Sequence, residues 1–232
     1  MKIMTFNTQH CLNYIEQKID FDVMANAIRA CDPDIVGLNE MRGEGVHPEY
    51  TEQVKTLAEK TGMSYYYFAP AIVLNGEGPY GNGFLSKIPI LHAEMIFVPD
   101  PDVPVAGHGY ETRCVLKATL ENGVTVLVSH FGLYPEEQKN AVDTVVKHLE
   151  KEKCVFMGDL NLTPENALLS PIRERMKDTA DAFDGEKRSF PSDAPDRKID
   201  YIFVSPDAAV VSADIPAIVA SDHRPHIAEI IF

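Results

Sequence analysis

The run Val155–Pro164 constrains the fold more than any other stretch, because an apolar sequence ends there abruptly in polar residues. The apolar part reaches Gly158, and Asp159 and Asn161 follow it directly. This pattern is typical of a buried strand that delivers polar side chains to the edge of a sheet. Two residues apart in a strand, the acid and the amide would point to the same face. A second interpretation, that both side chains only cap the following turn, stays open at this point.

Polar residues of the same kind stand at the ends of five further apolar runs. Each of them alone has a simpler explanation, since a single Asp or Asn at a strand end is usually a turn former. Acidic groups that gather at one edge of a sheet repel each other, however, unless a hard cation neutralises them. Carboxylate and amide oxygens suit Mg²⁺ or Mn²⁺. We therefore predict a metal-assisted site built from the whole set, which comprises Asn7, Glu40, His130, Asp159, Asn161, Asp200, Asp222 and His223.

Strand and helix spacing alternate in the first part of the chain. Lys2–Thr8 and Asp34–Leu38 are apolar enough for buried strands, and Phe21–Ala30 between them has apolar residues at helical spacing. A strand, a helix and a second strand in this order imply parallel pairing through a crossover. A second helix is predicted over Tyr50–Thr61, where Gly62 ends it.

The rest of the chain is predicted to be rich in strands. An Asn-Gly turn at Asn122-Gly123 between two apolar runs is a strong signal for an antiparallel hairpin. One helix is expected to begin at Pro135, and another is expected over Glu165–Met176. The strands are expected over Met63–Ala69, Asn82–Ser86, Ile90–Val98, Arg113–Leu120, Val124–Ser129, Ile199–Val204 and His226–Phe232.

Three stretches are expected to be loops: Ala71–Gly81, Pro99–Gly109 and Asp178–Arg197. The Pro- and Asp-rich second stretch is the best candidate for a loop that shapes the substrate site. No Ser/Gly-rich linker, charge block or internal repeat divides the chain. Residues 1–232 are therefore expected to form a single catalytic domain.

The composition is that of an ordinary globular protein, with 45% hydrophobic and 24% charged residues. No segment approaches the about 20 apolar residues that a membrane helix needs. The N-terminus enters an apolar strand directly and lacks the pattern of a signal peptide. The four cysteines form no C-x-x-C pair, so we expect reduced thiols, no zinc site and a cytoplasmic location. Nothing in the sequence indicates a protein partner.

The net charge of −14, from 35 acids against 21 bases, bears on the substrate. Non-specific nucleic-acid binders usually carry a basic stripe, because neutralisation of phosphates supplies most of their affinity. The basic residues here are dispersed along the chain. A long polyanion would be repelled, whereas a small anion held by a metal ion would suffer much less. The composition therefore disfavours a nucleic-acid partner without excluding one.

Seven segments, taken together and in order, resemble the endonuclease/exonuclease/phosphatase superfamily. They span essentially the whole chain, and Gly-Asp-x-Asn and Ser-Asp-His are specific when they occur together in this order. The family commonly has Gln where Asn39 stands, before a Glu that this chain keeps. The segments are Thr5–Asn7, Asp34–Glu40, Tyr80–Ser86, Ser129-His130, Gly158–Asn161, Lys198–Ile202 and Ser221–Pro225.

The resemblance implies a four-layer α/β sandwich, in which two mixed β-sheets pack face to face with helices outside. It also implies metal-dependent hydrolysis of a phosphate ester. By position, Glu40 would bind Mg²⁺, with Mn²⁺ as a substitute. Asn7 and Asp222 would assist Glu40 in holding the ion.

The resemblance also implies roles for five residues around the reacting phosphate. Asp159 would orient and deprotonate the attacking water, and Asn161 would hold a phosphoryl oxygen. His223, oriented by Asp200, would stabilise the charge that grows on the phosphorus oxygens, and His130 would donate to another oxygen. These roles agree with the chemistry, because in-line displacement at phosphorus needs a positioned nucleophile and positive charge around the non-bridging oxygens.

Contacts to the rest of the substrate are indicated less strongly. Arg113 opens a strand, where it could reach the substrate or pair with an acid. Asn82 and Tyr80 are candidates for lining the pocket, with a place in the sandwich core as the alternative. Phe190 could stack on a substrate group or anchor its loop.

The expected function is hydrolysis of a phosphodiester or phosphomonoester, small or lipid-linked, by in-line attack of an activated water. An endonuclease or exonuclease acting on DNA or RNA is the alternative, although the chain has no Trp and no evident basic groove. A catalytically inactive binding module would require the loss of a site residue, and all are present. Loops set the choice of substrate in such a fold, so the sequence leaves the substrate open.

Overall fold

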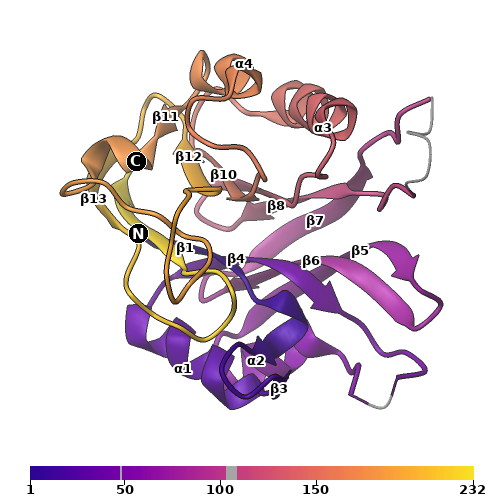
Figure 1. Ribbon diagram of the computed structural model, residues 1–232. Helices are drawn as coiled ribbons and strands as arrows, with labels where there is room; N and C mark the ends of the chain where they lie inside the picture. The colour runs from indigo at the N-terminus through magenta and orange to yellow at the C-terminus, as the bar shows by residue number, and fades with distance from the viewer. Residues whose placement is uncertain (48, 103–108) are drawn as a thin grey trace.

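The computed structural model describes residues 1–47, 49–102 and 109–232. Within these residues, two six-stranded sheets face each other and helices cover both outer faces (Figure 1). Each sheet contains parallel and antiparallel neighbours. This is the four-layer α/β sandwich expected from the sequence.

The centre of each sheet is a parallel pair of strands flanked by antiparallel neighbours. In the first sheet β1 runs parallel to β4, and in the second β10 runs parallel to β9. The first sheet consists, in spatial order, of β13 (Ala209–Asp214), β14 (His226–Ile231), β1 (Lys2–Asn7), β4 (Ile35–Arg42), β6 (Gly78–Ser86) and β5 (Tyr65–Leu74). The second consists of β11 (Lys177–Asp178), β12 (Asp200–Val204), β10 (Cys154–Asp159), β9 (Thr125–Ser129), β8 (Cys114–Leu120) and β7 (Ile90–Phe97).

Two helices cover each outer face, and local capping explains where several of them begin. The carboxylate of Asp20 accepts hydrogen bonds from the first N–H groups of α1, and Pro135 occupies the first turn of α3. The helices are α1 (Phe21–Cys31) and α2 (Gln53–Thr61) on the first sheet, and α3 (Pro135–His148) and α4 (Ser170–Arg173) on the second. Smaller elements are the 3-10 turns η1 (Gln9–Cys11), η2 (Ala167–Leu169) and η3 (Thr179–Ala182) and the hairpin of β2 (Leu12–Asn13) and β3 (Lys18–Ile19).

The central strands are buried on both faces, which explains their nearly continuous apolar sequences. In β1, Ile3 packs between the sheets, whereas Met4 packs against the side chains of α1 and α2. In β10, Met157 packs between the sheets, whereas Phe156 packs toward α3. Alternate residues of one strand therefore join two layers of the sandwich.

Strand register brings together polar residues that are far apart in the sequence. The parallel pairing of β1 and β4 places Asn7 beside Asn39, and the antiparallel pairing of β10 and β12 places Asp159 opposite Asp200. Between the sheets, the backbone N–H of Asp159 donates to Oδ1 of Asn39 at 2.9 Å. The polar strand ends of both sheets therefore meet at one place.

The predicted loop over Ala71–Gly81 is wrong, because β5 continues to Leu74 and pairs with β6 from Gly78. The pairing shifts register between Pro70 and Ile72. This irregularity lets β5 continue past a proline that sequence rules treat as a break.

The predicted helix over Glu165–Met176 is also largely wrong, since only η2 and the single turn of α4 form there. Asn166 caps η2 by accepting a hydrogen bond from the N–H of Leu168. Pro171 then lies in the first turn of α4, where its missing N–H is tolerated.

The edge strand β13 was not predicted. Residues 103–108 of the predicted loop Pro99–Gly109 lie outside the described residues.

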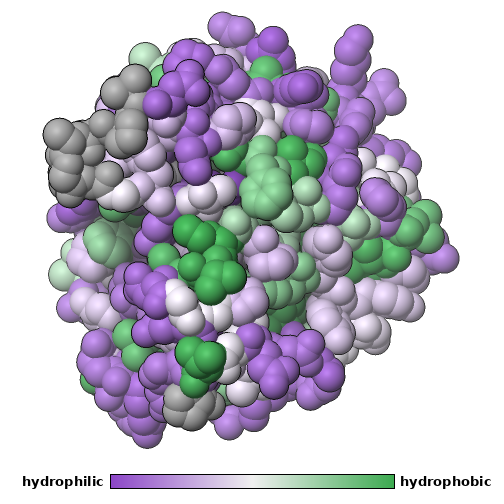
Figure 2. Space-filling model, turned by 90° about the vertical axis from the view of Figure 1, so that its right-hand side faces the viewer, coloured by the Kyte–Doolittle hydropathy of each residue, from purple (hydrophilic) through white to green (hydrophobic). Residues whose placement is uncertain are grey.

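The surface and the cysteines carry further information. All four cysteines are buried and free. Among the described residues, no helix is long and apolar enough to cross a membrane. The face shown in Figure 2 is mostly hydrophilic, and apolar side chains gather near its middle.

We predict that Gly158→Ala lowers the free energy of unfolding by about 2–4 kcal/mol. Gly158 has φ +148°, which L side chains rarely adopt, and an added Cβ would lie 1.8 Å from the carbonyl oxygen of Ser129. Urea unfolding measures the change. Gly109→Ala is the control, since an added Cβ there meets none of the described residues within 4 Å. Equal stability of the two variants would contradict the strained, close-packed position of Gly158.

Candidate active site

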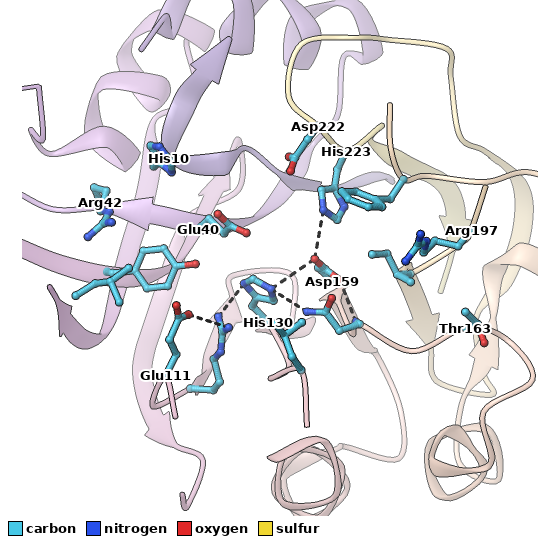
Figure 3. Close-up of a pocket in the computed structure, with 17 residues that line it drawn as sticks. His10, Glu40, Arg42, Glu111, His130, Asp159, Thr163, Arg197, Asp222 and His223 are labelled. Atoms are coloured by element: carbon cyan, nitrogen blue, oxygen red, sulfur yellow. Dashed lines mark hydrogen bonds and ion pairs between the residues drawn. The ribbon is translucent and has the colours of Figure 1, made fainter. Parts of the chain in front are cut away.

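A cavity of about 610 Å³ lies where the polar strand ends of the two sheets meet. Arg42 and His10 lie at one end of it, Arg197 and Thr163 lie at the other, and Asp159 lies between them (Figure 3). The lining residues are His10, Glu40, Arg42, Leu74, Tyr80, Glu111, Arg113, His130, Leu133, Asp159, Asn161, Thr163, Phe190, Arg197, Ile199, Asp222 and His223.

The structure gathers the site residues predicted from the sequence at this cavity. Seven of them line it: Glu40, Arg113, His130, Asp159, Asn161, Asp222 and His223. The other three, Asn7, Asp200 and Asn82, are buried behind the lining and bond to residues of the site or of its support. The scattered polar residues thus converge, as the sequence predicted.

Asp159 is the centre of the arrangement. Its Oδ2 accepts a hydrogen bond from the amide of Asn7 at 3.0 Å and lies 3.5 Å from Nε2 of His130 and 3.6 Å from Nε2 of His223. Its Oδ1 accepts from the backbone N–H of Asn161 at 3.0 Å. Burial raises the pKa of Asp159 to about 7, although the charge of His223 opposes the rise. This carboxyl group is therefore poised to exchange a proton near neutral pH.

His223 and Asp200 form a buried pair. Nδ1 of His223 lies 2.8 Å from Oδ2 of Asp200, and the carboxylate is fully buried. Burial alone would lower the pKa of His223, but the carboxylates of Asp200 and Asp159 raise it to about 10. The imidazole therefore carries a positive charge at neutral pH, and Asp200 fixes its orientation.

His130 is the opposite case, because it stays neutral. Nη1 of Arg113 lies 3.0 Å from Nδ1 of His130, and since a guanidinium can only donate, Nδ1 accepts. The ring proton is then on Nε2, which faces Asp159. Burial and the charges of Arg113 and His223 lower the pKa of His130 well below its ordinary value. The two histidines of the site therefore differ in charge although both are buried.

Asn161 is held in an unusual backbone conformation that directs its amide into the same group. Its φ is +50°, in the left-handed region. Its Nδ2 donates to the carbonyl oxygen of Phe131 at 3.0 Å and lies 3.2 Å from Nε2 of His130. The carbonyl of Asn161 accepts from the side chain of Gln138 on α3 at 3.1 Å. The amide is thus fixed beside His130 and Asp159.

Glu40 and Asp222 are the carboxylates that fit a divalent cation. Glu40 lies within β4 at an interruption of its pairing and has φ +62°, which turns its side chain out of the regular strand pattern. Burial, and then the negative charge of Asp222, raise the pKa of Glu40. A cation would offset both effects, and an all-oxygen donor set suits Mg²⁺.

Asn7 supports this group in a different way from the one expected. Its amide nitrogen donates to Oε1 of Glu40 and to Oδ2 of Asp159, both at 3.0 Å. Its amide oxygen accepts from the backbone N–H of Gln9 at 3.0 Å. In this arrangement Asn7 bridges the two carboxylates and presents no oxygen to a cation.

Asp159, Asp200 and His223 also lie close enough together to hold a metal ion, with one potential ligand atom from each within 4.8 Å of the others. A charged imidazole has no lone pair to offer, however, and the pKa of His223 is raised to about 10. Its Nδ1 is in addition bonded to Asp200. For the metal-free protein we therefore interpret these three residues as a hydrogen-bonded relay. Glu40 and Asp222 are further carboxylates of the cavity that could hold a cation.

Asn82, expected as a substrate contact, lies behind the cavity wall. Its Oδ1 accepts from Asn39 at 2.8 Å, and its Nδ2 donates to the carbonyl of Cys114 at 2.9 Å. The side chain is 2% exposed, so it positions Asn39 instead of touching a ligand. The sequence reasoning noted Asn39 only as a departure from the family pattern, although Asn39 orients Asp159.

Arg113 and Phe190 both line the cavity, and each also has a partner within the protein. Arg113 pairs with Glu111 at 2.9 Å and also lines the cavity. The ring of Phe190 lines the cavity and lies 4.7 Å from the ring of His223. The sequence reasoning missed Arg42 as a lining residue, although it lies only two positions after Glu40 in the same strand.

Comparison with known proteins supports the resemblance seen in the sequence. A family model described as Endonuclease/Exonuclease/phosphatase family matches residues 4–223, which is nearly the whole chain. Among curated protein sequences, none matches this chain.

Solved structures with the same fold share little sequence with this chain. An endonuclease/exonuclease/phosphatase from Beutenbergia cavernae is 23% identical with a TM-score of 0.78, and the match covers 99% of this chain and 71% of that one. A protein with the same description from Bacteroides vulgatus is 20% identical with a TM-score of 0.78, covering 100% and 98%. A mannosyl-6-phosphatase from Bacteroides thetaiotaomicron is 18% identical with a TM-score of 0.76, covering 100% of both chains.

We predict that in the metal-free protein the ring of His223 is charged at pH 8, whereas that of His130 is neutral at pH 6. Asp200→Asn removes a charge that raises the pKa of His223, so this pKa should fall by at least about one pH unit. Imidazole ¹⁵N shifts recorded against pH measure both rings. Asp143→Asn on the exposed side of α3 is the control and should leave His223 unchanged.

The raised pKa of His223 makes the stability of the fold depend on pH. Because the folded protein raises the pKa of His223 from an ordinary 6.5 to about 10, the pair stabilises the fold fully below about pH 6.5. This contribution is lost as the pH rises toward about 10. A neutral His223 at pH 8 would contradict the assigned relay.

Proposed function

The chain belongs to the endonuclease/exonuclease/phosphatase family of phosphoric ester hydrolases, and from that premise we propose that it is a Mg²⁺-dependent phosphoesterase acting on a small or lipid-linked phosphate ester. The observation that carries the proposal is the environment of the Asp159 carboxylate. It lies beside one neutral and one charged imidazole, at 3.5 Å and 3.6 Å, and shares Asn7 with the carboxylate of Glu40. A base, positive charge and a cation position are thus combined within one cavity.

Asp159 acts as the base in the proposed reaction. A pKa of about 7 leaves a substantial fraction of the carboxyl group ionised at neutral pH and able to take a proton from water. The backbone N–H of Asn161 and the amide of Asn7 hold its two oxygens in fixed directions. The water is thereby aligned for in-line attack on the phosphorus atom.

The other side chains stabilise charge on the phosphoryl oxygens. His223 is charged and donates through Nε2, while its Nδ1 is held by Asp200. His130 is neutral and donates through Nε2, and the amide of Asn161 adds a further donor. Such donors are effective because they are oriented before the reaction begins. A divalent cation held by Glu40 and Asp222 would supply additional positive charge to the same oxygens.

The size and lining of the cavity support a small substrate or the head group of a lipid. Its volume of about 610 Å³ falls within the range of about 300–1,000 Å³ that is usual for small-molecule sites. Leu74, Leu133 and Ile199 add apolar surface beside the charged groups. The net charge of −14 disfavours a long polyanion.

A panel of phosphate esters with Mg²⁺, and with EDTA as the metal-free arm, tests this proposal. It sets bis-p-nitrophenyl phosphate and p-nitrophenyl phosphate against mannose 6-phosphate, inositol phosphates, sphingomyelin, plasmid DNA and abasic DNA. We expect Mg²⁺-dependent hydrolysis of a small or lipid ester. Asp159→Asn should lower kcat at least about a hundredfold, because it removes the base. His223→Ala should have an effect of the same order, because it removes a charged donor.

The control for these variants is Asp143→Asn, which removes an exposed carboxylate of α3 and should keep full activity. Cleavage of the DNA substrates alone would favour a nuclease instead. Near-wild-type turnover by folded Asp159→Asn would refute the assigned base.

We predict that Glu40→Gln raises the Mg²⁺ concentration needed for half-maximal activity at least about tenfold. The substitution keeps the size of the side chain but removes the charge that would hold the cation. Mn²⁺ binding followed by electron paramagnetic resonance gives a second readout that does not need turnover. Glu59→Gln, on the exposed side of α2, should leave both values unchanged. An unchanged metal requirement would place the cation elsewhere.

A further inference from the structure

Arg42 is a buried cation at the end of the cavity that lies away from Arg197 (Figure 3). Its side chain is 5% exposed. Its Nε and Nη1 have no hydrogen-bond partner among the described residues. Its Nη2 lies 3.8 Å from Oε2 of Glu77, which is beyond hydrogen-bonding distance. Because a guanidinium does not lose its proton in proteins, a permanent charge with unused donors lines the cavity.

Two aromatic rings hold Arg42 in place without using these donors. The guanidinium carbon lies 4.5 Å from the centre of the Tyr50 ring and 4.9 Å from that of the Tyr80 ring. The face of an aromatic ring attracts the charge without providing a conventional hydrogen-bond acceptor. The rings therefore favour the charge and its orientation but leave the N–H groups free for an acceptor.

Gln53 fixes Arg42 and His10 relative to each other. Its Oε1 accepts from the backbone N–H of Arg42 at 2.9 Å, and its Nε2 donates to the carbonyl of His10 at 2.8 Å. Gln53 itself is fully buried at the start of α2. Burial and then the charge of Arg42 lower the pKa of His10 to about 4, so its ring is neutral. A neutral imidazole and a guanidinium without a hydrogen-bonded acid thus border the same end of the cavity.

The other two arginines of the lining already have acidic partners. Arg113 lies 2.9 Å from Glu111 and contacts His130, and Arg197 lies 2.6 Å from Asp196. Among the lining residues that the structure describes, Arg42 is therefore the arginine without a hydrogen-bonded acid. Its Cα can lie at most about 7 Å from that of Glu40, because only one residue, Met41, lies between them. A ligand at Arg42 is thus within reach of one bound at Glu40 and Asp159.

We propose that Arg42 and His10 form a second anion subsite, and that the substrate carries a second anionic group, a carboxylate or a phosphate, a short linker away from the reacting phosphate. The position of that phosphate rests on the proposed function. The second group would pair with the charged guanidinium of Arg42, whose Nε and Nη1 have no hydrogen-bond partner among the described residues. It would also stand beside His10, whose pKa should rise when a negative charge arrives.

Binding of phosphonates tests the subsite, because their carbon–phosphorus bond is not hydrolysed and Mg²⁺ can be present. Propylphosphonate carries one anionic group, whereas 4-phosphonobutanoate and propane-1,3-diyl bisphosphonate carry two. Isothermal titration calorimetry on the wild-type protein should give a Kd at least about tenfold lower for one of the two-anion ligands. The preferred member of that pair then identifies the second group as carboxylate or phosphate.

Arg42→Gln should abolish most of that preference and change the Kd of propylphosphonate by less than about threefold. Arg175→Gln is the control, since it removes an exposed charge outside the cavity lining and should keep the preference. Equal weakening of all ligands by Arg42→Gln, or no preference in the wild-type protein, would overturn the proposal, because a purely structural arginine predicts these results.

A second measurement uses only the wild-type protein and does not depend on the folding of a variant. The preferred two-anion ligand should raise the pKa of His10 from about 4 by at least about one pH unit in imidazole ¹⁵N titrations, and propylphosphonate should not. An unchanged His10 with the bound ligand would overturn the subsite. Neither measurement requires turnover. The second anion subsite can therefore be confirmed even if no ester of the activity panel is cleaved, and it can be refuted even if the protein is an active phosphoesterase.

Discussion

One hydrogen bond between the two sheets, from the backbone N–H of Asp159 to Oδ1 of Asn39, fixes the geometry on which the site depends. Asn39 in turn donates to Asn82, and Asn82 donates to the carbonyl of Cys114. This buried chain of amides passes from β10 of the second sheet to β4 and β6 of the first sheet and returns to β8 of the second. Apolar packing between the sheets is non-directional, so it cannot by itself set their relative position at the level of single atoms. A satisfied polar network can, because each of its members is costly to leave unpaired.

The second constraint is electrostatic. Burial raises the pKa values of both Asp159 and Glu40, which would favour neutral acids in a metal-free cavity. Asp200 offsets part of this effect by holding a positive charge on His223 beside Asp159. Arg113 does the reverse for His130, whose Nδ1 it occupies and whose charge it disfavours. Two identical, buried side chains thus become a charged and a neutral donor, because carboxylates surround His223 whereas burial and the charge of Arg113 act on His130.

The sequence predicted much of the site because its residues lie at strand ends, where apolar runs stop at chemically distinctive side chains. Asp159, Glu40 and His223 are recognisable in this way. What the sequence could not show is the direction in which each side chain points. Asn82 stands in a segment typical of the family, yet its amide faces Asn39 and the interior. Asn7 presents nitrogen and not oxygen to the carboxylates. Such orientations depend on partners that only the folded chain brings near.

The errors in secondary structure have a related cause. Pro70 did not end β5, because a shift of register absorbed it, and Pro171 did not interrupt a long helix, because only a single turn forms there. Local rules treat proline as a break, whereas pairing with β6 decides the outcome in β5. At Pro171 the local rule holds, and the error lies in the long helix that was predicted across this proline.

The chain carries a net negative charge, and cations line its cavity beside the carboxylates. The chain is strongly acidic, with a net charge of −14, yet three arginines and a charged histidine line its cavity. At the surface, charges farther apart than about 8 Å are screened at physiological salt, so the repulsion of a distant polyanion is weak. The basic residues are dispersed along the chain, however, so no basic stripe attracts such a polymer. Inside the cavity the same cations act at short range and with little water between them. A cavity that holds these cations inside an acidic surface would suit a small anion better than a long one. Arg42, which has no hydrogen-bonded acid among the described residues, is the place where a second charge of the ligand would be felt most.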